Sequence, residues 1–356
     1  MASSPILLAM GNPLLDMQVR DGEKLLEKYG LKSNDAILAE EKHMPIYAEV
    51  TGMSPVYVAG GAAQNAARCA QYILPAGSTV YLGSVGKDDL AEQLRSANKK
   101  EGLQDLYQVV DGQPTGACAV VITGHDRSLC TQLGAAEKFA PSHLKTPEVS
   151  KAIQDAKFYY VGGFFLTHGI ESTLELAEIS VKENKVFTMN LSAPFIPQFF
   201  KDNVDKVMPY VDYLFGNESE AEAFAQAHSW DTTDLTVIAT RIASLPKKLT
   251  SRPRVVIITQ GAKATIVASS SVSPFPSSAP IQKNDSGHYF IVAVSPLSDD
   301  QIVDTNGAGD AFAGGVLGAL GLNKPLDNCI EIGHKLGQMC VGQVGPQLKW
   351  PKVQVV

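Results

Sequence analysis

Asp304-Thr305-Asn306-Gly307-Ala308-Gly309-Asp310 is the most informative segment of this 356-residue chain, and an apolar run with helical character, residues 311–320, follows it. Glycines at a loop-to-helix junction let backbone N–H groups approach an anion, and the helix N-terminus adds its positive dipole end. A phosphate group would fit there, and Asp310 in the first turn could take a proton from a hydroxyl. The alternative is an Asx turn with a helix cap, in which Asp310 only satisfies the dipole.

Other phosphate-binding motifs fail on spacing. Gly83-Ser84-Val85-Gly86-Lys87-Asp88 lacks the four intervening residues and the Ser or Thr of a Walker A loop. Residues 307–314 do not form the GxGxxG pattern of dinucleotide-binding proteins. The sequence therefore disfavours both a P-loop enzyme and a dinucleotide-dependent dehydrogenase.

The second half of the chain alternates short β-branched runs with helical patterns. Strands are expected at residues 158–162, 186–191, 211–215 and 255–259, and helices at residues 170–181 and 217–227. This alternation predicts an α/β fold with a mostly parallel sheet, covered by helices on both faces, and ligands at the carboxyl ends of the strands. Residues 5–15 are expected to form a buried first strand, and the Ser- and Pro-rich residues 269–286 a surface loop or hairpin connection.

Two stretches, residues 17–57 and 112–138, interrupt this rhythm and could form a small lid across the open end of the sheet. We therefore predict two domains. The large α/β domain would comprise residues 1–16, 58–112 and 139–356, and the small lid domain residues 17–57 and 113–138.

The composition is that of a globular protein, with 45% hydrophobic and 19% charged residues. The net charge of −7 argues against a surface that binds a phosphate backbone, so we expect no nucleic acid partner. The five cysteines show no metal-ligand spacing and are interpreted as free thiols in a reducing compartment. Without a basic leader or an apolar span of about 18 residues, we expect no membrane association and a cytoplasmic location, alone or with a nuclear fraction.

Three further patterns each allow two interpretations. Gly60-Gly61 opens a second helix in which Asn65 could bind a polyol, but the glycines could equally form a tight strand-to-helix turn. Asn217 and Glu220 could support Mg²⁺ and phosphate, although a capping box is the interpretation that local sequence favours. Asp16 at the end of the first strand pattern could accept hydrogen bonds from two hydroxyls, but an isolated Asp there is more often a turn former.

Taken together, these residues make the chain similar to the ribokinase-like (pfkB) carbohydrate kinase family and, within it, to the eukaryotic adenosine kinases. The two family signatures correspond to Gly60-Gly61 with Asn65 and to residues 304–310. Further matching segments are Gly11-Asn12-Pro13-Leu14-Leu15-Asp16, Leu38-Ala39-Glu40, Asp126-Arg127-Ser128-Leu129, Gly163-Phe164-Phe165-Leu166-Thr167, Asn190-Leu191-Ser192-Ala193-Pro194-Phe195 and Phe215-Gly216-Asn217-Glu218. The match extends over residues 11–334 in the family order, and this makes it specific.

The resemblance implies a ribokinase-like fold, in which a large three-layer α/β/α domain carries a small α/β lid. It also implies an enzyme that uses ATP and Mg²⁺ to phosphorylate the 5′-hydroxyl of adenosine, with AMP and ADP as products. Asp310 would be the catalytic base, and the amides of Gly307, Ala308 and Gly309 would form the anion hole. Arg127, on the lid, would clamp the phosphate.

The resemblance also implies the contacts of the two binding sites. The ribose hydroxyls would be held by Asp16, Gly61 and Asn65. The adenine ring would be enclosed by Leu14, Leu38, Leu129, Phe164 and Phe195, and flat apolar walls of this kind suit a purine. Asn306 would line the substrate site. The ATP site would contain Asn190, Asn217, Glu220, Thr259, Gly261 and His334, of which Asn217 and Glu220 would support Mg²⁺ through water.

Two other functions stay open from the sequence. The protein could be a kinase for another nucleoside, such as inosine or guanosine, or for a sugar such as ribose, although the apolar walls argue against a plain sugar. It could also be a non-catalytic nucleoside-binding protein, which would need neither Asp310 nor an uninterrupted glycine loop. The expected partners are the small molecules adenosine and ATP, and the expected state is a monomer.

Overall fold

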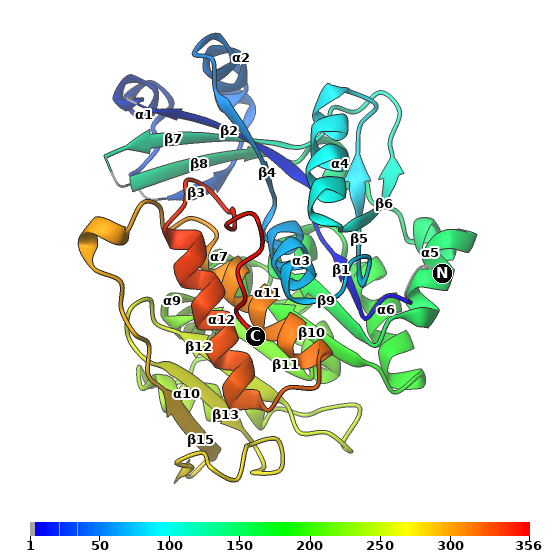
Figure 1. Ribbon diagram of the computed structural model, residues 1–356, viewed down its shortest axis with the longest axis vertical. Helices are drawn as coiled ribbons and strands as arrows, with labels where there is room; N and C mark the ends of the chain where they lie inside the picture. Colours follow the sequence, from blue (N-terminus) through cyan, green and yellow to red (C-terminus); the bar gives the residue numbers. More distant parts are fainter. Residues whose placement is uncertain (1–3, 21, 34, 125) are drawn as a thin grey trace.

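The computed structural model of the chain describes residues 4–20, 22–33, 35–124 and 126–356 and contains two sheets, one of ten strands and one of five (Figure 1). The ten-stranded sheet runs through the larger part of the molecule. The five-stranded sheet lies at one end of it, together with two short helices.

The larger sheet is mostly parallel. Its strands, in spatial order, are β14 (Gln282–Asn284), β15 (Gly287–Val292), β13 (Thr265–Ser269), β12 (Val255–Thr259), β11 (Tyr213–Asn217), β10 (Val186–Asn190), β9 (Phe158–Gly162), β1 (Leu7–Met10), β5 (Thr79–Val85) and β6 (Gln104–Val109). The neighbouring strands from β12 to β6 are parallel, and the three at the other edge are antiparallel. The predicted parallel sheet is confirmed. The Ser- and Pro-rich stretch is partly strand, because only residues 270–281 connect β13 to β14.

Helices cover both faces of this sheet. One face packs against α5 (Pro147–Asp155), α6 (Ile170–Lys182), α8 (Lys201–Val207), α9 (Glu218–Ala227) and α10 (Leu235–Ala243), and the other against α3 (Ala62–Ile73), α4 (Asp89–Glu101), α11 (Ala308–Gly321) and α12 (Leu326–Val341). Alternate residues of a strand point to opposite faces, so Leu8 and Met10 join one buried apolar cluster while Leu7 and Ala9 join the other. The shorter helices are α7 (Phe195–Phe199) and the 3-10 helices η1 (Glu41–His43), η2 (Gly134–Lys138), η3 (Pro141–Lys145), η4 (Gly163–Thr167), η5 (Met208–Tyr210) and η6 (Asp299–Gln301).

The smaller sheet has its own core. Its strands, in spatial order, are β3 (Ala36–Leu38), β8 (Asp126–Gln132), β7 (Ala117–Thr123), β2 (Leu14–Arg20) and β4 (Val56–Gly60). Helices α1 (Glu23–Tyr29) and α2 (Pro45–Gly52) pack on this sheet through a separate apolar cluster that includes Leu25, Ile46 and Val50. The opposite face of the sheet is turned toward the larger unit, because Asp16 and Leu129 line a cavity there.

The start of the chain differs from the expectation of one strand over residues 5–15. Gly11-Asn12-Pro13 separates β1, in the larger sheet, from β2, in the smaller one. Proline has no N–H to donate to a sheet ladder, which favours a break at this point. Asp16 therefore lies inside β2, paired with Cys118 and Val58, and not at the end of the first strand.

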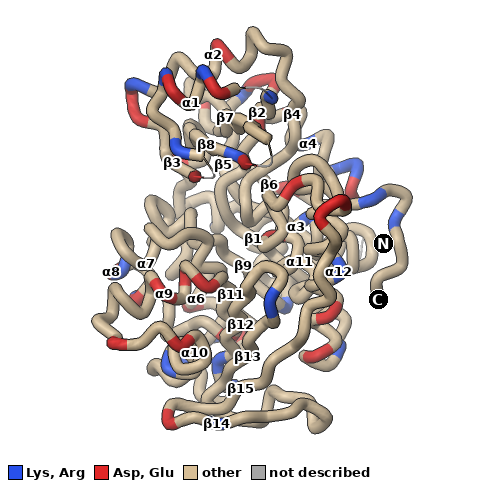
Figure 2. Tube along the Cα trace, turned by 90° about the vertical axis from the view of Figure 1, so that its left-hand side faces the viewer, with Lys and Arg blue, Asp and Glu red and all other residues tan. Residues whose placement is uncertain are grey.

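Charged residues of both signs are interspersed along the chain (Figure 2). No helix in the described part of the chain is long and apolar enough to cross a membrane. All five cysteines are buried and free, as interpreted from their spacing.

The glycines of α11 allow it to pack closely against α3. A Cβ atom on Gly314 would lie 2.4 Å from the carbonyl oxygen of Ala66 and 2.5 Å from Cβ of Cys69. A Cβ atom on Gly318 would lie 2.7 Å from Cβ of Ile73. Only a helix without side chains at these positions can approach α3 so closely, and this approach brings the first turn of α11 next to the first turn of α3.

We expect Gly314→Ala to lower the free energy of unfolding by about 1–3 kcal/mol, because the added methyl group overlaps backbone atoms that cannot move freely. Chemical denaturation of the purified protein measures this change. Gly52→Ala is the matched control, because a Cβ there meets nothing within 4 Å. Equal losses in the two variants would contradict the close-packing explanation.

Candidate active site

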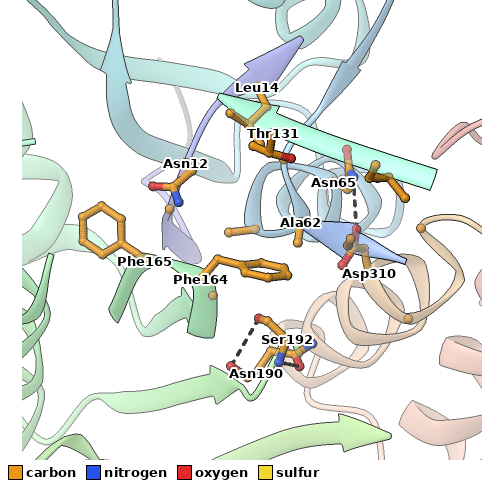
Figure 3. Close-up of a pocket in the computed structure, with 18 of the residues that line it drawn as sticks. Asn12, Leu14, Ala62, Asn65, Thr131, Phe164, Phe165, Asn190, Ser192 and Asp310 are labelled. Carbon is orange, nitrogen blue, oxygen red and sulfur yellow. Dashed lines mark hydrogen bonds between the residues drawn. The ribbon is translucent and has the colours of Figure 1, made fainter. Parts of the chain in front are cut away.

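A cavity of about 340 Å³ lies between the two sheets, at the carboxyl ends of the parallel strands (Figure 3). Gly162, Asn190, Asn217 and Thr259, which end β9, β10, β11 and β12, all line it. The predicted site residues that line this cavity are Leu14, Asp16, Leu38, Gly61, Asn65, Leu129, Phe164, Asn190, Phe195, Asn217, Glu220, Thr259, Asn306, Gly307, Gly309 and Asp310. The structure thus brings together residues from both sequence signatures and from both sheets.

Asp310 lies in the first turn of α11, next to the first turn of α3. Asn65 Nδ2 donates a hydrogen bond of 3.0 Å to Asp310 Oδ2 (Figure 3). Burial raises the pKa of Asp310 to about 7, although the hydrogen bond from Asn65 favours the charged form. A carboxyl group with this pKa is suited to accept a proton near neutral pH.

The start of α11 presents free backbone amides to the cavity. Gly307 caps the helix in the left-handed conformation, with φ of 77°, and both Gly307 and Gly309 line the cavity. No described residue accepts a hydrogen bond from either of these two amides. Ala308 differs from the expectation, because its amide donates to Thr305 O at 3.3 Å and the residue does not line the cavity. The hydrogen bond from Ala308 to Thr305 closes the turn and occupies the amide of Ala308. The amides of Gly307 and Gly309 stay available to an anion.

Asp16 is a second carboxylate at the cavity, and it is buried. A Cβ on Gly60 would lie 2.3 Å from Asp16 Oδ1, so glycine is needed for the carboxylate to lie there. Burial, reinforced by the nearby charge of Asp310, raises the pKa of Asp16 to about 7. Gly61, with φ of 88°, then turns the chain from β4 into α3. The two interpretations of Gly60-Gly61 are therefore compatible, because the strand-to-helix turn that these glycines form also lines the cavity.

The other end of the cavity is apolar. Phe164 of η4 and Phe195 of α7 have ring centroids 5.9 Å apart with an interplanar angle of 43°. Leu14, Leu38 and Leu129 line the same cavity from the smaller sheet. The two aromatic rings and three leucines are surfaces on which a flat, apolar ring system can stack.

Asn217 and Glu220 form the capping box of α9. Asn217 Oδ1 accepts the amide of Glu220 at 2.9 Å, and Glu220 Oε2 accepts the amide of Asn217 at 3.0 Å. The capping interpretation is confirmed, yet both side chains also line the cavity. Burial raises the pKa of Glu220 to about 7, against the lowering effect of the hydrogen bond from Asn217.

Four predicted residues lie outside the cavity lining, namely Ala308, described above, and Arg127, His334 and Gly261. Arg127 Nε donates to Asp304 Oδ1 in a buried ion pair that joins the smaller sheet to the segment before α11. His334 Nε2 lies 2.8 Å from Thr265 Oγ1, and its ring packs against Phe312, between α12 and the sheet. Gly261, with φ of 56°, forms the turn after β12. The positions of Arg127 and His334 follow from partners far away in the sequence, which local patterns do not reveal.

Some lining residues were not assigned a role from the sequence. They include Asn12, Cys118, Thr131, Phe165 and Ser192. Asn12, Phe165 and Ser192 stand in the segments that carry the family resemblance, so a signal was present. Ser192 has φ of 69°, and its Oγ accepts the amide of Gly163 at 2.8 Å. Cys118 and Thr131 become neighbours only because β7 pairs with β8.

Known proteins resemble this chain over nearly its whole length. Residues 23–353 match the pfkB family carbohydrate kinases. The adenosine kinase of Schizophyllum commune is 56% identical over 356 residues, which are 99% of this chain and 100% of that protein. The crystal structure of Anopheles gambiae adenosine kinase in complex with P1,P4-di(adenosine-5) tetraphosphate is 42% identical, with a TM-score of 0.87 over 94% of this chain and 95% of that one. Adenosine kinase from Schistosoma mansoni in complex with 2-fluoroadenosine is 34% identical, with a TM-score of 0.88 over 98% of each chain. These likenesses confirm the predicted fold.

We expect Asp310→Asn to stabilise the protein above neutral pH. Because the folded-state pKa is about 7 and the reference value is 3.8, the folded state holds this proton between these values while the unfolded state releases it. The carboxyl group therefore costs stability as pH rises through this window, and asparagine removes that cost.

Thermal unfolding at pH 4 and pH 8 measures the effect. The variant should exceed the parent protein by about 1–3 kcal/mol at pH 8 and match it near pH 4. Asp111→Asn, at an exposed turn, is the control and should show no such pH dependence. A difference that is equal at both pH values would rule out titration of Asp310 as its cause.

Proposed function

The chain belongs to the pfkB family of carbohydrate kinases, and from this membership we propose that it acts as an adenosine kinase, which transfers the γ-phosphoryl group of ATP to the 5′-hydroxyl of adenosine. The observation that carries the proposal is full-length identity of 56% to an adenosine kinase. The cavity supports it, because an apolar end that suits adenine lies in the same space as a half-buried carboxylate at a helix N-terminus. The products are AMP and ADP.

Asp310 is proposed as the general base. Its carboxylate takes the proton of the 5′-hydroxyl while that oxygen forms a bond to the γ-phosphorus and the bond from the γ-phosphorus to the bridging oxygen of ADP breaks. The amides of Gly307 and Gly309, with the N-terminal end of the α11 dipole, face the negative charge of the transferring group. Asn65 fixes the orientation of the base through its hydrogen bond.

The nucleoside is proposed to lie with its ribose near Asp16, Gly61 and Asn65 and its adenine between Phe164 and the leucines of the smaller sheet. A carboxylate can accept hydrogen bonds from two adjacent hydroxyls, which suits Asp16 for the 2′- and 3′-positions. This orientation turns the 5′-hydroxyl toward α11, where Asp310 lies.

Mg²⁺ fits the donor set on the ATP side. Glu220 is a buried carboxylate that lines the cavity, and no described cation forms an ion pair with it. Mg²⁺ at phosphate sites typically uses one or two carboxylates together with water and phosphate oxygens. Glu220, with Asn217, would hold the ion through water, and the ion would supply positive charge to the phosphates. Asn190 and Thr259 line the neighbouring part of the cavity and are proposed as ATP contacts.

The smaller sheet is proposed to act as a lid, and Arg127 as its phosphate clamp. Arg127 is paired with Asp304, and its Nη1 has no hydrogen-bond partner in the described structure. Phosphate oxygens would compete with Asp304 for this guanidinium. A guanidinium group can donate two parallel hydrogen bonds to a phosphate as well as to a carboxylate. Closure of the lid would keep water away from the phosphoryl group.

Measurement of ADP formation tests the proposal. We expect turnover with ATP, Mg²⁺ and adenosine to exceed that with inosine, guanosine, ribose or fructose, because only a purine fits the apolar end and only adenosine has the 6-amino group. Asp310→Asn should lower kcat by about 10²- to 10⁴-fold, the usual range for loss of a general base. Preference for another substrate would correct the assignment of the nucleoside, and near-normal turnover in the variant would exclude Asp310 as the base. Binding of adenosine without ADP formation would favour a non-catalytic protein.

We also expect Phe164→Ala to raise KM for adenosine by about 10-fold or more with a smaller change in kcat, because the lost stacking surface acts on binding and not on the transferred group. Steady-state kinetics with adenosine and with ATP as the varied substrate measure this. KM for ATP should change little. Phe199→Ala, at an exposed ring on α7, is the control. A fall in kcat without a change in KM for adenosine would place Phe164 elsewhere in the reaction.

A further inference from the structure

His168 lies directly behind the wall of the cavity and is hydrogen-bonded to a residue that lines it. His168 Nε2 lies 3.0 Å from Asn12 Oδ1, across 156 positions of sequence. Asn12 lines the cavity close to Phe164 and Phe165 (Figure 3), whereas His168 does not line it. His168 packs edge-on against Phe165, with ring centroids 5.0 Å apart.

The backbone of Asn12 has little freedom. A Cβ on Gly61 would lie 2.2 Å from the carbonyl oxygen of Asn12, so the two backbones are in close contact. Asn12 is followed by Pro13, whose ring fixes its own φ and restricts the residue before it. The side-chain dihedrals of Asn12 are the freedom that is left, and the hydrogen bond to His168 restricts them.

The hydrogen-bond roles in this pair follow from burial. Burial lowers the pKa of His168 to about 4, so the ring is neutral and carries one N–H. Its Nδ1 is buried without a partner. A buried N–H without an acceptor is rarer than a buried acceptor without a donor, which assigns the hydrogen to Nε2. Nε2–H then donates to Asn12 Oδ1, and the amide oxygen of Asn12 is occupied.

Asn12 Nδ2 is therefore free to donate into the cavity. No acceptor for Nδ2 is found among the described residues, and the atom is not among the buried polar atoms that lack a partner, so it is open to the cavity that Asn12 lines. An amide that could rotate would present an oxygen as readily as a nitrogen. The hydrogen bond from His168 holds the oxygen of the Asn12 amide, so the nitrogen is the atom that faces the cavity as a donor.

We propose that His168 is a positioning residue for nucleoside binding: it fixes the amide of Asn12 so that Nδ2 donates a hydrogen bond to an acceptor atom of the bound nucleoside. This inference rests on the proposed function, because it takes the ligand of the cavity to be a nucleoside. His168 acts through Asn12 and contacts no substrate. Its effect falls on binding of the nucleoside and leaves the phosphoryl-transfer groups at α11 untouched.

A double-mutant cycle tests the coupling. His168→Phe keeps the ring but removes the donor, and we expect it to weaken adenosine binding about 3- to 10-fold, the range for a neutral hydrogen bond, with kcat changed less than about twofold. Asn12→Ala should weaken binding at least as much, and adding His168→Phe to Asn12→Ala should have no further effect. Titration calorimetry with adenosine, in the absence of ATP, gives each Kd, and steady-state kinetics give kcat.

Two variants and one spectroscopic measurement complete the design. His168→Gln can place an amide nitrogen near the position of Nε2 and should restore most of the affinity. His228→Gln, at a histidine that pairs with Asp205 and does not line the cavity, should leave adenosine binding unchanged. Nitrogen NMR of the unsubstituted protein should show His168 as the neutral Nε2–H tautomer, and this measurement needs no variant to fold.

Additive losses in the cycle, an unchanged Kd in His168→Phe, or an Nδ1–H tautomer would each overturn the role of His168. These results are distinct from failure of the proposed function. If the unsubstituted protein binds adenosine and forms ADP but the cycle is additive, only this inference fails. If the unsubstituted protein binds no adenosine, the proposed function and this inference fail together.

Discussion

The hydrogen bond from Asn65 to Asp310 joins residues 245 positions apart and connects the two glycine-containing signatures. It depends on the close approach of α3 and α11, which exists only because Gly314 and Gly318 carry no side chains at the contact. The same approach orients the start of α11, where Gly307 turns the chain and leaves amides free. The carboxyl group proposed as the base and the amides proposed to bind the anion are therefore both placed by the packing of these two helices, and neither could be repositioned without the other.

Three carboxyl groups line the cavity around this point, of which Asp16 and Glu220 are buried and Asp310 is half-buried. Burial raises the pKa of Asp16, Asp310 and Glu220 to about 7 each. Arg127, which reaches the segment before α11, is already paired with Asp304. Where these groups are ionised, a polyphosphate placed here would face negative charge on several sides. Under the proposed function, positive charge would come to it from the free backbone amides, from a divalent ion and from a released Arg127.

Features set by local sequence were predictable, and features set by distant partners were not. The strands at residues 158–162 and 255–259 match β9 and β12, because short runs of aromatic or β-branched residues favour half-buried or buried strands. The capping box of α9 is also a local pattern. The break that moves Asp16 into the smaller sheet, the ion pair of Arg127 and the packing of His334 all require knowledge of which strands and helices are neighbours. The family resemblance supplied much of the site, but it could not tell that Ala308 uses its own amide in a turn.

The two ends of the cavity present different kinds of binding group, backbone amides at one end and side chains at the other, so substitutions affect them differently. At α11 the groups proposed to bind the anion are backbone amides fixed by helix packing, so a substitution other than at Asp310 would alter them only by disturbing the core. At the nucleoside end the binding groups are side chains, and their orientation depends on residues behind the wall, as Asn12 depends on His168. Under the proposed role of His168, a substitution in that supporting layer changes one hydrogen bond and leaves the groups at α11 in place. Selectivity for the nucleoside could then vary through residues that never touch it, while the proposed base and amides stay fixed by the packing of α11.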